Sequence, residues 1–269
     1  MQVEVNGPRL WFDVDGPALV PDGPRMRPRP TIIFVHGGPG GYDHSYFKPD
    51  FARLTELAQV VYLDLREHGR SGREGPAGWS FERCADDLRT FYDLLGVERL
   101  VSLGHSMGGF VAMLYGIRHP GRAGGLILAS TNARFDLERL VERVRSRTDD
   151  AVAEIARRSY GGEAVGPDEW ARVFVAFGPH RPDADVLERR IRNPDVGVAG
   201  MELLRRFDVA GALGSIDVPT LVCVGELDAV TPVGASIGVV ADFVAQSTQP
   251  PNAAAEAVRA GWRIPADRL

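Results

Sequence analysis

One serine stands in a sequence context that is typical of a catalytic nucleophile. It is Ser106, in the segment Gly104-His105-Ser106-Met107-Gly108-Gly109, which follows an apolar run over 100–103 and precedes a helix-forming run over 110–118. In such a strand–turn–helix arrangement, glycines permit a tight turn and close backbone packing, and the serine hydroxyl is exposed above the sheet. A phosphate-binding loop is disfavoured because the segment lacks both the Walker lysine and the glycine spacing of dinucleotide-binding loops.

A second glycine-rich turn, His36-Gly37-Gly38-Pro39-Gly40, follows an earlier apolar run. Attack of a serine on a carbonyl carbon places negative charge on the carbonyl oxygen, and closely approaching backbone N–H groups stabilise that charge. A turn rich in glycine permits such an approach. We therefore expect the N–H groups of Gly38 and Met107 to form an oxyanion hole. The alternative is a turn that does no more than end a strand.

These residues need a scaffold, and the remaining sequence predicts an α/β fold. Short apolar runs bounded by turn residues are typical of strands buried on both faces of a parallel sheet; they cover 31–35, 60–63, 100–103, 125–128 and 220–224. The clearest helix is expected over 81–95, with Ser80 as its N-cap and Gly96 after its end. Alternating strands and helices predict a mainly parallel sheet flanked by helices.

The two ends of this pattern are less regular. Short strands are expected over 3–5 and 10–14, followed by a loop over 21–30 that is rich in Pro and Arg. After 224 no further apolar run indicates a last strand, so this region is atypical for the fold.

From 133 to 212 the strand pattern disappears, and amphipathic helical stretches follow one another. Examples are Leu137/Leu140/Val141/Val144 and Trp170/Val173/Phe174/Phe177. We interpret this segment as a helical cap inserted between two strands of the sheet. The domain assignment is thus 1–132 and 213–269 for the core, and 133–212 for the cap.

Composition excludes several classes of protein. The 269 residues are 44% hydrophobic and 25% charged, which suits a globular chain and excludes global disorder. The net charge of −5 disfavours a nucleic-acid partner. Two cysteines, Cys84 and Cys223, are too few for a disulfide framework, and no Cys/His spacing suits a metal site. No export signal or membrane-spanning run is present, so we expect a cytoplasmic protein without metal or cofactor that acts on a small molecule or short peptide.

Taken together, these motifs resemble the α/β-hydrolase superfamily, and His36-Gly37-Gly38-Pro39-Gly40 resembles its proline iminopeptidase branch. Asp64-Leu65-Arg66-Glu67-His68-Gly69-Arg70-Ser71 is similar to the family's Asp-x-Arg-Gly-x-Gly-x-Ser loop, with Glu67 in place of Gly. The resemblance covers about residues 1–236. It implies a serine hydrolase that cleaves an N-terminal amide or a related ester. The segment around the serine, Gly104-His105-Ser106-Met107-Gly108, is also similar to the corresponding segment of esterases and lactonases, which remain an alternative.

The resemblance also implies a catalytic triad. Asp228, after the strand expected over 220–224, stands where the family has its triad acid, because the chain order in this fold is Ser, acid, His. Asp64 is a weaker alternative that we expect to organise its own loop. Cap carboxylates receive the substrate's amino group in iminopeptidase-like enzymes, but we interpret the available ones as solvated helix faces: Glu138, Glu142, Glu154, Glu163 and Glu169.

The triad histidine is absent from the sequence. No histidine follows His180, although the family has one some tens of residues after the acid. His119 would lie about 20 Å from Ser106 along the helix, and we expect His36, His44, His68 and His105 to be structural or to face away. His180, in the cap, is a weak candidate for a surrogate base. Two alternatives to an active enzyme therefore remain: a non-catalytic hydrolase-fold protein, and the product of a shifted reading frame after 236.

We predict that this chain turns over proline arylamides and short p-nitrophenyl esters about 10⁴- to 10⁶-fold more slowly than a complete serine hydrolase, because that is the usual effect of losing a triad member. Steady-state kinetics with both substrate types test this. Ordinary enzyme rates that are abolished by Ser106→Ala would contradict it.

Overall fold

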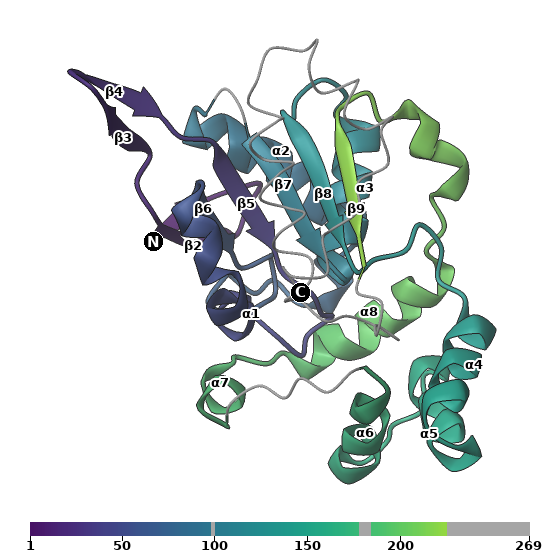
Figure 1. Ribbon diagram of the computed structural model, residues 1–269. Helices are drawn as coiled ribbons and strands as arrows, with labels where there is room; N and C mark the ends of the chain where they lie inside the picture. Colours follow the sequence, from purple (N-terminus) through teal and green to yellow (C-terminus); the bar gives the residue numbers. More distant parts are fainter. Residues whose placement is uncertain (98–99, 178–183, 225–269) are drawn as a thin grey trace.

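The computed structural model of the chain describes residues 1–97, 100–177 and 184–224, and its centre is a seven-stranded sheet (Figure 1). The strand order is β1-β2-β6-β5-β7-β8-β9. The strands are β1 (Gln2–Glu4), β2 (Arg9–Asp15), β5 (Thr31–Val35), β6 (Gln59–Leu63), β7 (Leu100–His105), β8 (Gly125–Ala129) and β9 (Thr220–Cys223). The pairs β1–β2 and β2–β6 are antiparallel and the others are parallel. The predicted mainly parallel sheet is confirmed.

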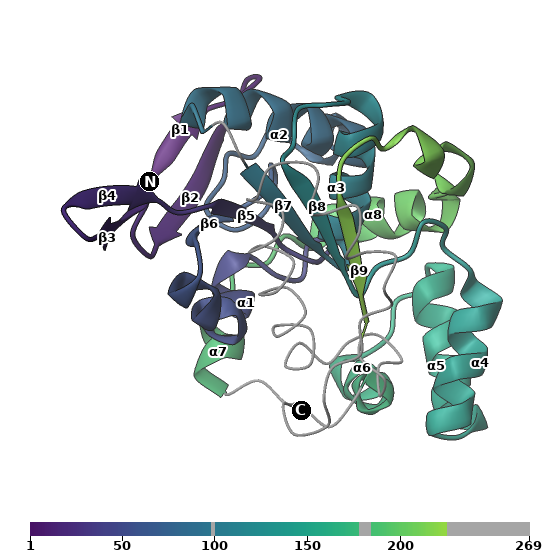
Figure 2. The same cartoon turned by 45° about the horizontal axis from the view of Figure 1, so that its top comes forward.

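Both faces of the central strands are buried, as the continuous apolar runs predicted. In β5 the side chains of Ile33 and Val35 join a core cluster with α2 (Phe81–Leu95) and α3 (Met107–Arg118). Ile32 and Phe34 point to the opposite face and join a cluster with α1 (His44–Phe51). Figure 2 shows α2 and α3 on one side of the sheet and α1 on the other. The period-two alternation of strand side chains therefore supplies both layers.

The helix expected over 81–95 is confirmed as α2. The Ser80 hydroxyl accepts a hydrogen bond from the N–H of Arg83 at 3.1 Å and caps the first turn. Gly96 ends the helix with φ at 62°, in the left-handed region that favours glycine.

The prediction of a loop over 21–30 is wrong in part. Residues 19–28 form an antiparallel hairpin of β3 (Leu19–Asp22) and β4 (Arg25–Pro28), and this hairpin projects from the body of the molecule (Figure 1). Asp22 pairs with Arg25, so the turn is Gly23-Pro24, with Gly23 at φ 59°. The prolines favour a loop, but a two-stranded hairpin consists of edge strands, where proline is tolerated.

Between β8 and β9 the described chain is helical. It forms α4 (Leu137–Arg147), α5 (Asp150–Gly161), α6 (Pro167–Phe174), α7 (Ala184–Arg189) and α8 (Pro194–Arg206). Two short 3₁₀ helices, Val175–Phe177 and Ala210–Ser215, lie in the same part of the described chain, and two others, Ala52–Glu56 and Pro76–Gly78, lie before β7. These five α-helices lie beyond the arrowheads of the parallel strands (Figure 1). None of the described helices is long and apolar enough to cross a membrane.

The inserted helices do not share one core. Buried residues of α4, α5 and α6 form a separate cluster that includes Val141, Ile155 and Val173. In contrast, Val196 and Leu204 of α8 belong to the same cluster as α2 and α3. Helix α8 is thus packed on the sheet layer, whereas α4 to α6 form a subassembly of their own.

A buried ion pair ties the loop after β6 to α2. Arg66 donates from Nε and Nη2 to the two carboxylate oxygens of Asp87 at 2.5 and 2.7 Å, and both side chains are at most 5% exposed. The Asn6 side chain also donates to Asp87, at 3.0 Å. Removal of one member of such a pair leaves the other charge buried without compensation.

We predict that Asp87→Ala lowers the free energy of unfolding by about 3 to 5 kcal/mol, because Arg66 remains buried and unpaired. Asp86→Ala is the matched control: the neighbouring carboxylate pairs with Arg118 at 2.8 Å, but both side chains are about 40% exposed, so the loss should be about 1 kcal/mol or less. Urea unfolding of both variants measures the difference, and equal losses would contradict the prediction.

Candidate active site

Ser106 occupies the sharp turn between β7 and α3. Its backbone has φ 53° and ψ −119°, a conformation that residues with a side chain rarely adopt. The Ser106 N–H donates to the carbonyl of Ala129 at 3.0 Å, which holds the turn against the end of β8. The side chain is half-buried and lines a cavity of about 370 Å³. Strain of this kind is kept in proteins where the surrounding structure enforces it.

Glycines allow the turn to pack this closely. A Cβ atom on Gly104 would lie 2.3 Å from the carbonyl oxygen of Gly108, and one on Gly108 would lie 2.0 Å from the carbonyl oxygen of Val35. A Cβ on Gly109 would lie 2.4 Å from Cγ2 of Thr131. The first turn of α3 therefore contacts the ends of β5 and β8 directly, through backbone that carries no side chain.

The structure brings Gly38 and Met107 together beside Ser106. A Cβ on Gly38 would lie 3.0 Å from Cε of Met107, and all three residues line the same cavity. Met107 is the first residue of α3, where backbone N–H groups have no acceptor within the helix. The two N–H groups expected to form the oxyanion hole thus belong to adjacent residues at the mouth of the turn.

Two buried histidines brace the loop that carries Gly38. Nε2 of His36 accepts from the N–H of Leu65 at 3.2 Å, and Nε2 of His68 accepts from the N–H of Gly40 at 3.0 Å. In each ring Nδ1 donates to a backbone carbonyl, at 2.6 and 2.9 Å. Burial lowers the pKa of both rings, that of His68 to about 3. Both are neutral, with both nitrogens occupied, and neither is available as a base.

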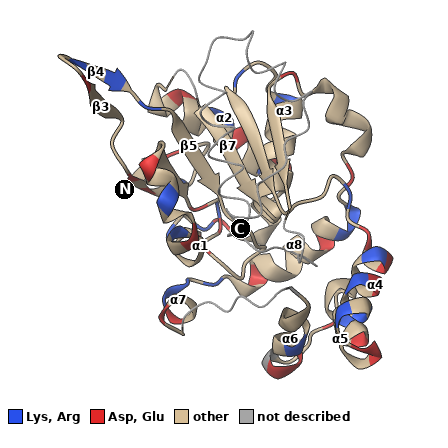
Figure 3. Cartoon of the chain, in the orientation of Figure 1, with Lys and Arg blue, Asp and Glu red and all other residues tan. Residues whose placement is uncertain are grey.

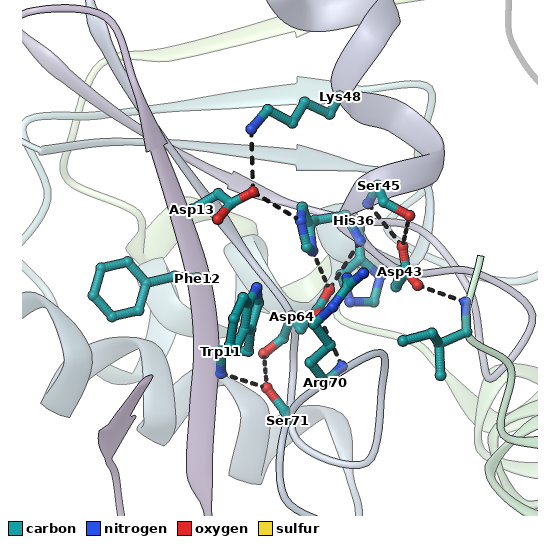
Figure 4. Close-up of polar contacts among 12 residues, drawn as sticks. Trp11, Phe12, Asp13, His36, Asp43, Ser45, Lys48, Asp64, Arg70 and Ser71 are labelled. Atoms are coloured by element: carbon teal, nitrogen blue, oxygen red, sulfur yellow. Dashed lines mark hydrogen bonds and ion pairs between the residues drawn. The ribbon is translucent and has the colours of Figure 1, made fainter. Parts of the chain in front are cut away.

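Asp64 organises the loop that follows β6 (Figure 4). Its Oδ1 accepts from the N–H and from Nδ1 of His44, at 2.9 and 2.8 Å, and its Oδ2 accepts from the N–H of Arg70 at 2.9 Å. The Ser71 hydroxyl donates to the Asp64 carbonyl at 2.6 Å. Burial raises the pKa of Asp64, but the hydrogen bond and charge of His44 outweigh it and hold that pKa below its ordinary value. This carboxylate is a brace of its own loop.

The carboxylate of Asp43 approaches the same group. Ligand atoms of Asp43, His44 and Asp64 lie within 4.8 Å of one another. However, Asp43 Oδ1 caps α1 by accepting from the N–H of Ser45 at 2.7 Å, and its Oδ2 accepts from the N–H of Ile191 at 2.6 Å. These hydrogen bonds already use the carboxylate oxygens, so we interpret the cluster as a brace rather than as a metal site.

None of the described histidines is hydrogen-bonded to the Ser106 hydroxyl. Nε2 of His119 donates to a carboxylate oxygen of Asp86 at 2.9 Å, at the far end of α3. Neither ring nitrogen of His105 has a partner among the described residues, and the ring packs 4.9 Å from that of Phe47 in the core. His180 lies outside the described residues. The described part of the chain therefore holds a positioned serine without a positioned base.

Comparisons with known proteins find a matching family model and similar chains. A family model described as alpha/beta hydrolase fold matches residues 30–161. Proline iminopeptidase PfmaB from Pestalotiopsis fici is 27% identical over 244 residues, which are 86% of this chain and 83% of the relative. The chain has the α/β-hydrolase fold and is similar to proline iminopeptidases.

Solved structures agree with this assignment. The proline iminopeptidase of Mycobacterium smegmatis has a TM-score of 0.65 with 21% identity, covering 92% of this chain and 98% of that one. The enol-lactonase from Burkholderia xenovorans LB400 has a TM-score of 0.55 with 25% identity, covering 82% and 80%. The predicted fold class and the resemblance to proline iminopeptidases are thus confirmed at the level of the superfamily.

The loop after β6 departs at Glu67 from the pattern that the sequence resembles, and the structure accounts for the departure. Glu67 has φ at 65°, in the left-handed region where glycine is favoured. Its side chain accepts hydrogen bonds from the N–H groups of Glu74 and Gly75, and its carbonyl accepts from the Asn193 side chain at 2.9 Å. These contacts offset the backbone strain.

Other predicted site residues are not brought to Ser106. Asp228 lies outside the described residues, so its role stays a prediction. The five glutamates of the expected cap do not line the described cavity: four are exposed and Glu169 is half-buried. Four of the five are in ion pairs, namely Glu138 and Glu154 with Arg157, Glu142 with Arg145, and Glu169 with Arg158.

The arginines of the cavity were not foreseen from the sequence. Five of them line it, and Asp136 is the only acidic residue among the described lining residues. The arginines are Arg134, Arg139, Arg143, Arg190 and Arg192. A signal existed for two of them, because Arg139 and Arg143 are one turn apart on the helix expected in the cap. The other three lie outside helices and strands, where sequence periodicity does not predict which way a side chain points.

We predict that His105 makes the fold sensitive to acid. Burial of the ring lowers the pKa of His105 to about 4. The unfolded chain therefore binds a proton at about pH 6.5 that the folded chain rejects until about pH 4, and stability falls as the pH decreases through that window. From pH 7 to 5 the loss should be about 2 kcal/mol.

His105→Asn removes this titration while keeping a side chain of similar size. Urea unfolding of both proteins at pH 7 and pH 5 is the measurement, and the variant should lose about 2 kcal/mol less between the two pH values. A difference in the free energy of unfolding that is the same at both pH values does not affect the comparison. Parallel losses in the two proteins would show that His105 is not the group responsible.

Proposed function

We propose that the chain is a serine hydrolase that cleaves a carboxylic ester or amide through Ser106. One observation carries the proposal: Ser106 has a positive φ at a turn enforced by glycine contacts, and its side chain faces a cavity beside Gly38 and Met107. A strained serine at the carboxyl end of a parallel strand is the geometry that an acyl-transfer nucleophile requires. We include a cytoplasmic location in the proposal, as expected from the sequence.

The reaction would follow from this arrangement in two steps. The Ser106 oxygen attacks the substrate's carbonyl carbon, and the N–H groups of Gly38 and Met107 stabilise the negative charge that develops on the carbonyl oxygen. The bond from carbon to the leaving oxygen or nitrogen then breaks, and the leaving group takes up a proton. Water attacks the acyl-serine in the second step, which releases the acid and restores the hydroxyl. Asp228 is the proposed triad acid, and 133–212 the proposed cap.

The proposal assigns no histidine as the base. Every described histidine other than His105 has a ring nitrogen in a hydrogen bond elsewhere, and no histidine follows His180 in this sequence. The serine proton would then leave to hydroxide from solvent. Turnover would therefore be slow near neutral pH and would rise with hydroxide concentration, in contrast to a complete triad, whose rate levels off once its histidine is neutral.

Two substrate classes compete within this function. The similarity to proline iminopeptidases favours an N-terminal amide, whereas the similarity to an enol-lactonase favours an ester or lactone. An N-terminal amide carries a cationic amino group, which needs a carboxylate in the cavity. Asp136, the one acidic residue among the described lining residues, already caps α4 by accepting from the N–H of Arg139 at 3.0 Å. We therefore favour the ester or lactone class.

We predict that a fluorophosphonate labels Ser106, with a rate that increases by about one log unit per pH unit between pH 7 and 10, because hydroxide replaces the missing base. Near pH 7 the rate should be about 10⁴- to 10⁶-fold below that of a complete serine hydrolase. Mass spectrometry of the labelled peptide identifies the site, and the rate is followed by loss of the free probe.

Two other serines, Ser130 and Ser159, line the same cavity and supply matched controls. Ser106→Ala should abolish labelling, while Ser130→Ala and Ser159→Ala should retain it. Labelling at either control serine, or none at pH 9 in a folded protein, would overturn the proposal and favour a non-catalytic hydrolase-fold protein. A rate that levels off near pH 7 would show instead that a histidine does serve as the base.

A further inference from the structure

Arginines converge on the cavity from two separate segments, the first of which is α4. Arg139, Leu140 and Arg143 are spaced as one face of this helix, and all three line the cavity. The acidic residues of α4 do not share this face: Glu138 pairs with Arg157 and Glu142 with a neighbouring arginine of the same helix. Apart from its N-cap residue Asp136, the helix therefore presents positive charge to the cavity and keeps its carboxylates elsewhere.

The second segment joins α7 to α8 and carries Arg190 and Arg192. Its backbone is fixed to the loop beside Ser106: the N–H of Ile191 donates to Asp43, and the N–H of Asn193 donates to the carbonyl of Gly40 at 2.8 Å. Figure 3 shows basic residues on α4 and next to α7. Hydrogen bonds at two of its residues thus hold this segment, and its arginines, at the cavity.

These arginines also reach the wall of the cavity formed by Tyr42. The guanidinium of Arg190 lies 5.3 Å from the centre of the Tyr42 ring. Burial raises the pKa of Tyr42, and the positive charges of Arg190 and Arg192 lower it. Arg190 is half-buried, so its charge acts in a partly desolvated site.

Four of the five arginines have no ion-pair partner in the described part of the chain. Arg134 pairs with Asp208 at 2.7 Å. Among the described residues, no carboxylate oxygen lies within 4.0 Å of a guanidinium nitrogen of the other four, Arg139, Arg143, Arg190 and Arg192. The chain as a whole has a net charge of −5, so this concentration of positive charge is local to the cavity.

We propose that the substrate carries an anionic group, a carboxylate or phosphate, away from the bond that is cleaved, and that Arg190 and Arg192 bind it together with the α4 arginines. The inference rests on the proposed function, because it concerns the cavity that contains Ser106. Guanidinium groups suit carboxylates and phosphates because their N–H groups match two oxygens at once. The substrate class is thus an ester, lactone or amide with an acidic end.

The test measures binding, so that it does not depend on turnover. Isothermal titration of Ser106→Ala uses three small esters of similar length: monomethyl glutarate, its neutral counterpart dimethyl glutarate, and the cation methyl 4-aminobutyrate. Methyl 3-phosphonopropionate is a fourth probe, which distinguishes phosphate from carboxylate. An anionic ester should bind at least about tenfold more tightly than the neutral and cationic ones, because its binding adds charge-assisted hydrogen bonds.

Variants assign the effect to the arginines. Arg190→Gln with Arg192→Gln should remove the preference for the anion, and Arg139→Gln with Arg143→Gln is a second pair, in case the first does not fold. Arg145→Gln with Arg157→Gln is the control: it removes the same charge from helix surfaces outside the cavity and should retain the preference.

Three results would overturn the inference: dimethyl glutarate binding as tightly as the anions, the cation binding more tightly, or the control pair losing the preference as fully as the cavity pairs. The last would attribute the effect to net charge. Failure of Ser106 to react with a fluorophosphonate would refute the proposed hydrolysis but leave anion binding intact, so the two failures are distinguishable.

Discussion

The site depends on one steric constraint, the contact between the first turn of α3 and the end of β5. A Cβ on Gly108 would lie 2.0 Å from the carbonyl oxygen of Val35, so a residue with any side chain would force the helix away from the sheet. Because α3 is this close, Ser106 must adopt its positive φ, and Met107 must lie against Gly38. A movement of the helix by the size of a methyl group would separate Ser106 and Met107 from Gly38.

Polar groups hold the surrounding loops in place where apolar packing cannot. The loop that contains Gly38 and Gly40 rests on His36 and His68, and its far side is hydrogen-bonded to the segment 190–193. Buried polar groups are costly unless they are paired, and here Nε2 of each ring pairs with a backbone N–H that is distant in sequence. The neutral state of both rings follows from their burial, and it lets each one accept a backbone N–H that would otherwise be unsatisfied.

The parts of this structure that local patterns encode could be predicted, and those that depend on distant contacts could not. Five apolar runs became parallel strands, and α2 begins and ends at the expected residues, because periodicity and capping are local properties. The hairpin of β3 and β4 was missed because its prolines suggested a loop. The approach of Arg190 and Arg192 to Ser106 was not predictable, since it depends on hydrogen bonds from 191 and 193 to residues about 150 positions earlier.

Binding of an anion and removal of the Ser106 proton would depend on different groups in this molecule, but the positive charges of the cavity would favour both. Binding of an anion requires arginines at α4 and at 190–192, all of which the described fold positions without any histidine. The same positive charges favour every negative charge that forms in the cavity, including the alkoxide of Ser106 and the oxygen of an attacked carbonyl. A serine without a base is therefore less disadvantaged here than in a neutral cavity. Selection of an acidic substrate and assistance to hydroxide-dependent attack would then have the same physical origin.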